Sequence, residues 1–247
     1  MRYLRAEHLT LKHSMFNRLL VIAPFCAAGF AFLAGGFSGI QYMGLYWWYS
    51  FLLQGTIAIL CVLSVQKEER AGKYYGVFSL PLQLGRYEMA RTLVTAEKLF
   101  VSGLALALLL SIPHVLSPQL VVFSVGKMLV GSSLIILTSL WQIPWCFLLM
   151  RKCGMVVTVA ANTLIGLFTM VIIGNSSFWW IWPYCWSAKL AEYWMGIGIN
   201  GVWQETLQQK NGSILLILAV SLLFFTMLTV LEAGLFVRKG GEGRSCR

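Results

Sequence analysis

Long apolar runs alternate with short polar segments along this chain. A helix needs about 20 predominantly apolar residues to cross a bilayer. Six runs approach or reach that length, at residues 19–37, 49–65, 94–113, 128–150, 156–173 and 214–237. Pro144 falls inside the fourth run, where we expect a kink. The pattern predicts an all-α integral membrane protein with six transmembrane helices in a single domain, 1–247.

Three polar segments predict further elements. Residues 66–98 hold ten of the 28 charged residues and predict a cytoplasmic loop between the second and third spans. Residues 174–212 are too rich in Gly, Pro and polar positions to span, yet too aromatic for a solvated loop, so we expect an outer segment at the membrane interface. The chain start predicts an amphipathic interfacial helix, because apolar or weakly polar residues recur at helical spacing: Leu4, His8, Leu11 and Met15.

Composition and charge agree with this interpretation. The chain is 58% hydrophobic and 11% charged, the balance of a multi-span membrane protein. Its basic residues are dispersed between apolar runs, which argues against a nucleic-acid partner despite a net charge of +10. With both termini cytoplasmic, all Lys and Arg fall in inner segments except Lys127, Lys189 and Lys210. We therefore expect a multi-pass protein of the cell membrane with both termini in the cytoplasm.

Motifs for catalysis are missing from the sequence. Glu68 and Glu69 followed by Lys73 resemble a paired-Glu metalloprotease motif, but the third position differs and the three histidines do not form a metal-binding pair. No G-x-x-x-x-G-K-[ST] motif is present to hold nucleotide phosphates. We expect no enzyme activity, metal or cofactor in this chain, and interpret Glu68 and Glu69 as charges on a helical continuation of the second span, where they are candidates for gating or coupling.

The sequence that begins at Gln66, QKEERAGKYYGVFSLPLQLGR, resembles the coupling region of the ABC-2 type exporter permeases. An amphipathic first helix, six spans and an aromatic outer segment before the last span are similar to that fold across the chain. Length, this wording and the Trp-rich segment most resemble the permease subunits of lantibiotic immunity transporters of the epidermin, mutacin and nisin type.

This resemblance implies an ATP-driven exporter in the bacterial cell membrane that expels a cationic antimicrobial peptide from the bilayer and so protects the producing cell. The implied partners are two copies of an ATP-binding subunit, which carry the ATP and magnesium, and a second, non-identical permease subunit. The residues implied to contact the ATP-binding subunit are Tyr74, Tyr75, Phe78, Leu80, Pro81, Leu82, Arg86 and Glu88. Alternatively, the apolar members of this set lie among lipid headgroups or pack under the bundle.

Polar residues inside the spans either line a path or pair helices, and we favour pairing: Gln54, Thr158, Asn162 and Thr169. Glu232 is expected to snorkel toward Arg238. A stripe of small residues in the first span predicts close packing inside this chain, or a dimer contact: Ala23, Ala27, Ala31 and Gly35. The outer segment offers either a surface for a cationic peptide or an aromatic belt: Trp179, Trp182, Trp186, Glu192, Trp194 and Glu205.

A second function class stays open at this point. A polytopic membrane protein without a transport cycle, which binds or senses a bacteriocin, has the same composition and topology. A nucleotide-binding partner separates the two hypotheses, because only the exporter requires one.

Overall fold

The computed structural model describes residues 2–12, 14–70, 82–204 and 211–245. These residues form helices, and within them the sole β pairing is an isolated bridge between Ile197 and Trp203. The expected all-α fold is therefore confirmed for the described residues. The elements in chain order are α1 (Arg2–Leu11), α2 (Met15–Trp47), the π-helix η1 (Trp48–Leu52), α3 (Leu53–Arg70), α5 (Leu84–Leu110), α6 (Ile112–Leu116), the 3-10 turn η2 (Pro118–Leu120), α7 (Val125–Ser139), α8 (Gln142–Ile173), the 3-10 turn η3 (Trp179–Ile181), α9 (Tyr184–Met195) and α10 (Asn211–Ser245).

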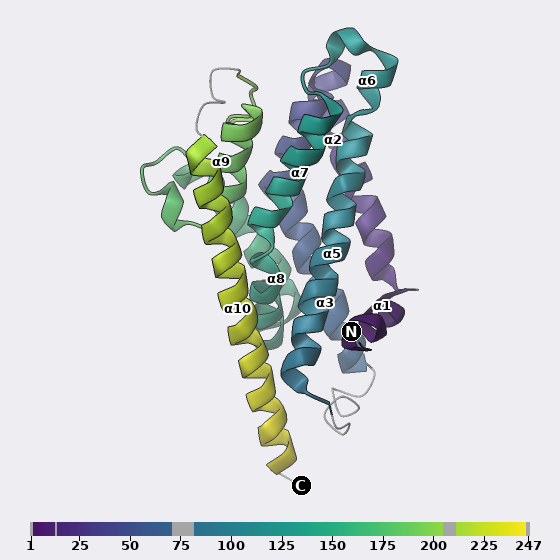
Figure 1. The fold of residues 1–247 in the computed structure, drawn as a ribbon, viewed down its shortest axis with the longest axis vertical. Helices are drawn as coiled ribbons and strands as arrows, with labels where there is room; N and C mark the ends of the chain where they lie inside the picture. The colour runs from purple at the N-terminus through teal and green to yellow at the C-terminus, as the bar shows by residue number, and fades with distance from the viewer. Residues whose placement is uncertain (1, 13, 71–81, 205–210, 246–247) are drawn as a thin grey trace.

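The long helices run roughly parallel to one axis of an elongated bundle (Figure 1). Within the described residues, four helical segments are long and apolar enough to cross a membrane: Met15–Arg70, Leu84–Leu116, Val125–Ile173 and Ser213–Arg238. Large apolar side chains on these segments point outward, and Leu33, Val156 and Leu215 are each more than 70% exposed. Such a surface is stable against lipid and costly against water. The long apolar helices therefore indicate a membrane protein.

The first of these segments folds back on itself at Gly36. The Phe30 ring centroid lies 6.1 Å from that of Trp47 and 6.2 Å from that of Phe51. A straight helix would hold Phe30 and Trp47 roughly 25 Å apart. Gly36 has φ 60° and ψ −159°, a conformation that is essentially restricted to glycine. The reversal lies next to residue 37, where the first predicted run ends.

The third segment folds back in the same way at Gly154. The Asn162 amide donates a 3.0 Å hydrogen bond to the Gln142 side chain, although a straight helix would separate these residues by roughly 30 Å. Gly154 has φ 80° and ψ −178°, again a glycine conformation. The reversal lies in the short polar gap between the predicted runs 128–150 and 156–173.

Helix α5 begins at Leu84, well before the predicted run 94–113. Its first turns are polar, and several of the polar side chains point into the bundle, including Glu88, Arg91 and Thr95. A hydropathy pattern assigns such turns to a loop, because it does not distinguish a buried charge from a solvated one. The prediction that residues 84–93 form part of a loop is therefore wrong.

The predicted fourth run is broken between two helices. Helix α7 ends at Ser139 and α8 begins at Gln142, so the break lies just before Pro144, close to the predicted kink. Helix α9 lies at the end of the bundle opposite α1 and packs against α7, α8 and α10 (Figure 1). Most of its side chains are buried. The aromatic segment before α10 is thus part of the folded bundle.

The small-residue stripe of α2 packs inside the chain. Ala23, Ala27 and Ala31 are buried, and α2 lies against α5. The contact is close enough for the Ser102 hydroxyl of α5 to donate a 2.7 Å hydrogen bond to the carbonyl of Leu20 in α2. The interpretation of this stripe as internal packing is therefore confirmed.

We predict that Gly36→Ala and Gly154→Ala each lower the free energy of unfolding by about 1–3 kcal/mol, because an L side chain is strained in these backbone conformations. A Cβ at either glycine meets no atom within 4 Å, so the cost comes from the backbone alone. Gly29→Ala in α2 is the matched control, since its Cβ also meets nothing and alanine favours helix. Thermal unfolding of the detergent-solubilised protein measures the difference, and equal midpoints for all three variants would contradict the prediction.

Candidate functional site

Five charged residues from four helices meet inside the bundle, at the end that carries α1. They are Glu68 of α3, Glu88 and Arg91 of α5, Arg151 of α8 and Glu232 of α10. We call this group the ion cluster. The side chains of Glu88 and Glu232 are 0% exposed, and the residue Arg91 is 1% exposed. Ionised groups inside a membrane bundle are rare and mark either function or a specific pairing of helices.

The two arginines each bridge two carboxylates. Arg151 Nη2 lies 2.7 Å from Glu88 Oε1, and Arg151 Nη1 forms an ion pair with Glu232 Oε1. Arg91 Nη1 lies 3.3 Å from Glu88 Oε1 and 3.4 Å from Glu68 Oε2. Glu88 is therefore the central member, shared by both guanidinium groups. The chain of contacts runs from α3 through α5 and α8 to α10.

Neutral side chains complete the surroundings of the ion cluster. Arg91 Nε donates a 2.8 Å hydrogen bond to the Ser64 hydroxyl, and the Tyr87 hydroxyl donates to Glu68. The Phe147 ring centroid lies 4.8 Å from Arg91 Cζ. The Phe236 ring centroid lies 4.4 Å from Arg151 Cζ. Aromatic faces attract cations and exclude water, so both guanidinium groups are held in a poorly solvated setting.

Local sequence explains how the members of the ion cluster reach one another. Glu88 and Arg91 are three residues apart on α5 and therefore share a helix face. Arg151 comes just before the reversal at Gly154, which places it at the tip of the α8 hairpin. Glu232 lies far along α10, which contacts both α5 and α8. Three of the four connections join residues distant in sequence, so the tertiary fold assembles the ion cluster.

Glu7 of α1 adds another buried carboxyl beside the ion cluster. It is 7% exposed, and α1 packs against α5. Burial raises the pKa of Glu7, while the positive charges of Arg91 and Lys67 oppose that rise. The ion cluster itself contains three carboxyl groups and two guanidinium groups. The positive charges of Arg91 and Arg151 therefore offset the electrostatic repulsion among the buried carboxylates.

The arrangement serves to connect helices. Among the described residues, no group of three or more His, Cys or Glu side chains is placed to hold a metal ion. A buried ion pair contributes little net stability against an apolar alternative, yet removing one partner is costly. An axial shift of α5 would separate Glu88 from Arg151. The ion cluster therefore fixes the positions of α3, α5, α8 and α10 relative to one another.

The predicted partner-binding residues divide into three groups. Tyr74, Tyr75, Phe78, Leu80 and Pro81 lie outside the described residues. Arg86 is exposed and Leu82 is half-buried at the start of α5, where both are accessible to a partner. Glu88 was expected on the same surface, but it is fully buried and pairs with Arg91 and Arg151 in the ion cluster. The assignment of Glu88 to the partner surface is corrected accordingly.

The two candidate coupling residues, Glu68 and Glu69, lie in different surroundings. Glu68 belongs to the ion cluster, where it pairs with Arg91. Glu69, the next residue of α3, is exposed. Glu232 was expected to snorkel toward Arg238, but its carboxylate is buried and pairs with Arg151. The snorkelling interpretation of Glu232 is therefore wrong.

A second polar group joins helices in the middle of the bundle. The Asn162 amide nitrogen donates to the Gln54 carbonyl at 2.9 Å and to Gln142 Oε1 at 3.0 Å, and its oxygen accepts from the Tyr184 hydroxyl at 2.9 Å. Thr158 and Thr169 donate only to carbonyls of their own helix, within the described residues. Helix pairing is therefore confirmed for Asn162, because its hydrogen bonds join α3, α8 and α9. The Gln54 side chain donates to the Tyr49 carbonyl just before its own helix, so pairing by Gln54 stays a prediction.

The candidate outer residues form no single exposed surface. Trp186 is buried against Phe224 of α10, and Glu192 forms a 2.6 Å ion pair with Lys189. Trp179 and Trp194 are half-buried, Trp182 is 42% exposed, and Glu205 lies outside the described residues. Burial raises the pKa of the nearby Cys185 thiol to about 11, so this cysteine stays protonated at neutral pH. The aromatic side chains here mainly hold α9 in the bundle.

Comparison with known proteins adds no assignment. No family model, curated protein or solved structure matches the chain.

Sequence reasoning missed the ion cluster, although one signal for it was present. Arg91, Arg151 and Glu232 were assigned to a loop, a turn and the membrane interface. A charged residue beside an apolar run is a candidate for intramembrane pairing, and these three adjoin or lie within the runs 94–113, 128–150 and 214–237. Which charges pair is decided by the reversal at Gly154 and by the packing of α10, and neither is visible in hydropathy.

We predict that Arg151→Met lowers the free energy of unfolding by about 3–5 kcal/mol, because it leaves Glu88 and Glu232 buried without their shared cation. Lys152→Met is the matched control, since Lys152 is the neighbouring basic residue and is exposed. Surface substitutions of that kind usually change stability by no more than about 0.5 kcal/mol. Thermal unfolding in detergent is the measurement.

A compensating variant tests the cause. Glu88→Gln and Glu232→Gln, added to Arg151→Met, remove the uncompensated carboxylates and should recover a large part of the lost stability. Equal unfolding midpoints for Arg151→Met and Lys152→Met would show that the ion pairs do not hold the bundle together.

Proposed function

We propose that this chain is the membrane-spanning permease subunit of an ATP-driven exporter. The proposal rests on the resemblance of residues 66–86 to the coupling region of ABC-2 type permeases, and on the position of the ion cluster relative to that region. The long apolar segments agree with a membrane subunit. ATP is bound and hydrolysed by a separate subunit, present in two copies, with magnesium.

A six-span topology is part of this proposal. The chain reversals at Gly36 and Gly154 support it, because each divides one long helical segment into two antiparallel helices. Helix α1, the start of α5 and the end of α10 lie at the same end of the bundle (Figure 1). An even number of crossings with both termini in the cytoplasm accounts for that placement and for the distribution of Lys and Arg.

The observation that carries the proposal is that the ion cluster takes residues from both helices that flank residues 71–81 in the chain. Glu68 closes α3 on one side of residues 71–81, and Glu88 and Arg91 lie in the first turns of α5 on the other side. Arg151 and Glu232 extend the contacts to α8 and α10. A force applied between α3 and α5 is thus transmitted to all four helices. The ion pairs transmit it because separating them would leave a buried charge without its partner.

The mechanism follows from this arrangement. Closure of the ATP-binding subunits pushes on the coupling region, α5 moves against α3 and α8, and the shared guanidinium groups carry α10 with it. The substrate class implied by the resemblance is a cationic antimicrobial peptide of the lantibiotic type, expelled to give immunity. Among the described aromatic candidates for peptide contact, Trp182 is the exposed one, with 42% of its surface accessible.

We predict that the wild-type chain, purified gently from its own host, brings down a Walker-motif ATPase, and that Leu80→Asp with Leu82→Asp abolishes the association. Two carboxylates in an apolar docking surface must be desolvated on binding, which costs more than the contact gains. Mass spectrometry of the co-purified proteins and an ATPase assay provide the measurements.

Asn175→Asp with Ser176→Asp is the matched control for added charge, because both residues lie beyond α8, away from the coupling region. This control should retain the ATPase. Absence of any nucleotide-binding protein from the wild-type preparation would contradict the exporter and favour a protein that binds or senses a bacteriocin without transport.

A further inference from the structure

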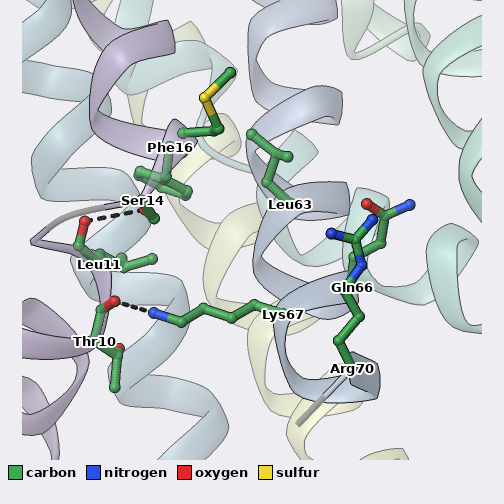
Figure 2. A pocket seen from close by; sticks show the side chains of 9 residues that line it. Thr10, Leu11, Ser14, Phe16, Leu63, Gln66, Lys67 and Arg70 are labelled. Carbon is green, nitrogen blue, oxygen red and sulfur yellow. Dashed lines mark hydrogen bonds between the residues drawn. The ribbon is translucent and has the colours of Figure 1, made fainter.

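A groove lies between the α1–α2 junction and the end of α3 (Figure 2). Its volume is about 400 Å³, within the range of about 300–1,000 Å³ that is usual for ligand sites. Thr10 and Ser14 contribute from the α1–α2 junction, and Leu63, Lys67 and Arg70 contribute from α3. None of the interactions proposed above for coupling uses this groove.

One part of the groove is apolar. Leu11 and Phe16 are buried beneath it, and Leu63 faces them from α3 (Figure 2). Met15 lines the groove as well and is 60% exposed. The groove adjoins the apolar segment that begins at Met15, so hydrocarbon can enter it from the side of the bundle. An occupant with an apolar portion would replace water against these side chains.

The other part of the groove is cationic. Lys67 extends across it from α3 and donates a hydrogen bond to the Thr10 carbonyl, as Figure 2 shows. Lys67 and Arg70 are exposed, and neither forms an ion pair with a carboxylate in the described part of the chain. The residues lining the groove include no Glu. An ammonium group has three N–H donors, so two remain on Lys67 for an anion.

Neighbouring residues on α3 therefore face different surroundings. Glu68 turns into the bundle and pairs with Arg91, while Lys67 turns toward the α1–α2 junction. The end of α3 thus separates its charges, with the carboxylate inside and the cations in the groove. Two exposed cations above an apolar floor, at the edge of a membrane-spanning segment, are complementary to an amphiphile with an anionic head.

We propose that this groove binds an anionic phospholipid, with the phosphate against Lys67 and Arg70 and the beginning of an acyl chain against Leu11, Phe16 and Leu63. Charge complementarity selects the anionic headgroup, and the apolar floor selects a lipid over a free anion. The bound lipid joins α1 to α3 next to the ion cluster. The inference does not depend on the proposed export function.

The test compares phosphatidylglycerol with phosphatidylcholine, each titrated as a short-chain lipid into the purified full-length chain in neutral detergent, with binding followed by native mass spectrometry. At roughly a factor of five per basic side chain near the lipid, two cations predict a preference of about 30-fold for phosphatidylglycerol. Lys67→Gln with Arg70→Gln should abolish that preference. Lys67→Arg with Arg70→Lys should keep it.

Two further variants make the result specific to the groove. Lys98→Gln with Lys152→Gln removes the same charge from residues that do not line the groove, and the preference should remain. Leu63→Trp fills the apolar part while keeping both cations, and it should reduce bound phosphatidylglycerol at least severalfold. This second variant also tests the site if the charge-neutral pair fails to fold.

Three outcomes would overturn the proposal. The first is equal binding of the two lipids by the wild-type chain. The second is a preference that survives both Lys67→Gln with Arg70→Gln and Leu63→Trp. The third is displacement of phosphatidylglycerol by inorganic phosphate at matched ionic strength, because the site would then recognise the anion without its lipid.

Discussion

Pairing of buried charge is the constraint on which the rest of this bundle depends. Glu88 and Glu232 are fully enclosed, and Arg151 lies between them. A membrane protein cannot solvate such groups with water in its interior, so each carboxylate must keep a cationic partner. The start of α5, the hairpin tip of α8 and the turn of α10 that carries Glu232 are therefore held level with one another along the bundle. Arg91 extends the same constraint to α3 through Glu68.

This constraint explains how a proposed coupling region could act on the whole bundle. The ion pairs oppose independent sliding of helix α5, because its first turns carry Glu88 and Arg91 into the centre of the ion cluster. Apolar packing tolerates small shifts in any direction, whereas an ion pair in a poorly solvated site loses much of its attraction when its partners separate. Movement at the start of α5 is consequently shared with α8 and α10.

The middle and the far end of the bundle are joined by weaker, neutral interactions. Asn162 links α3, both arms of α8 and α9 through amide and hydroxyl hydrogen bonds. Aromatic contacts such as Trp186 with Phe224 attach α9 to α10. Hydrogen bonds of this kind between membrane helices contribute on the order of 1 kcal/mol each. The bundle is therefore tied most firmly at the end that carries α1, beside the groove proposed to hold lipid.

The amino-acid sequence by itself determined the class of protein. Apolar runs of bilayer length required membrane helices, and small residues such as Ala27 marked a close contact within the chain. The pairing role of Asn162 also followed, because a buried amide in an apolar run needs a partner. The sequence did not determine where α5 begins or which charges meet. Arg91, Arg151 and Glu232 are far apart along the chain, and only the reversal at Gly154 and the packing of α10 bring them together around Glu88. Hydropathy measures the cost of moving one residue out of water, whereas the ion cluster depends on partners, which the tertiary structure alone supplies.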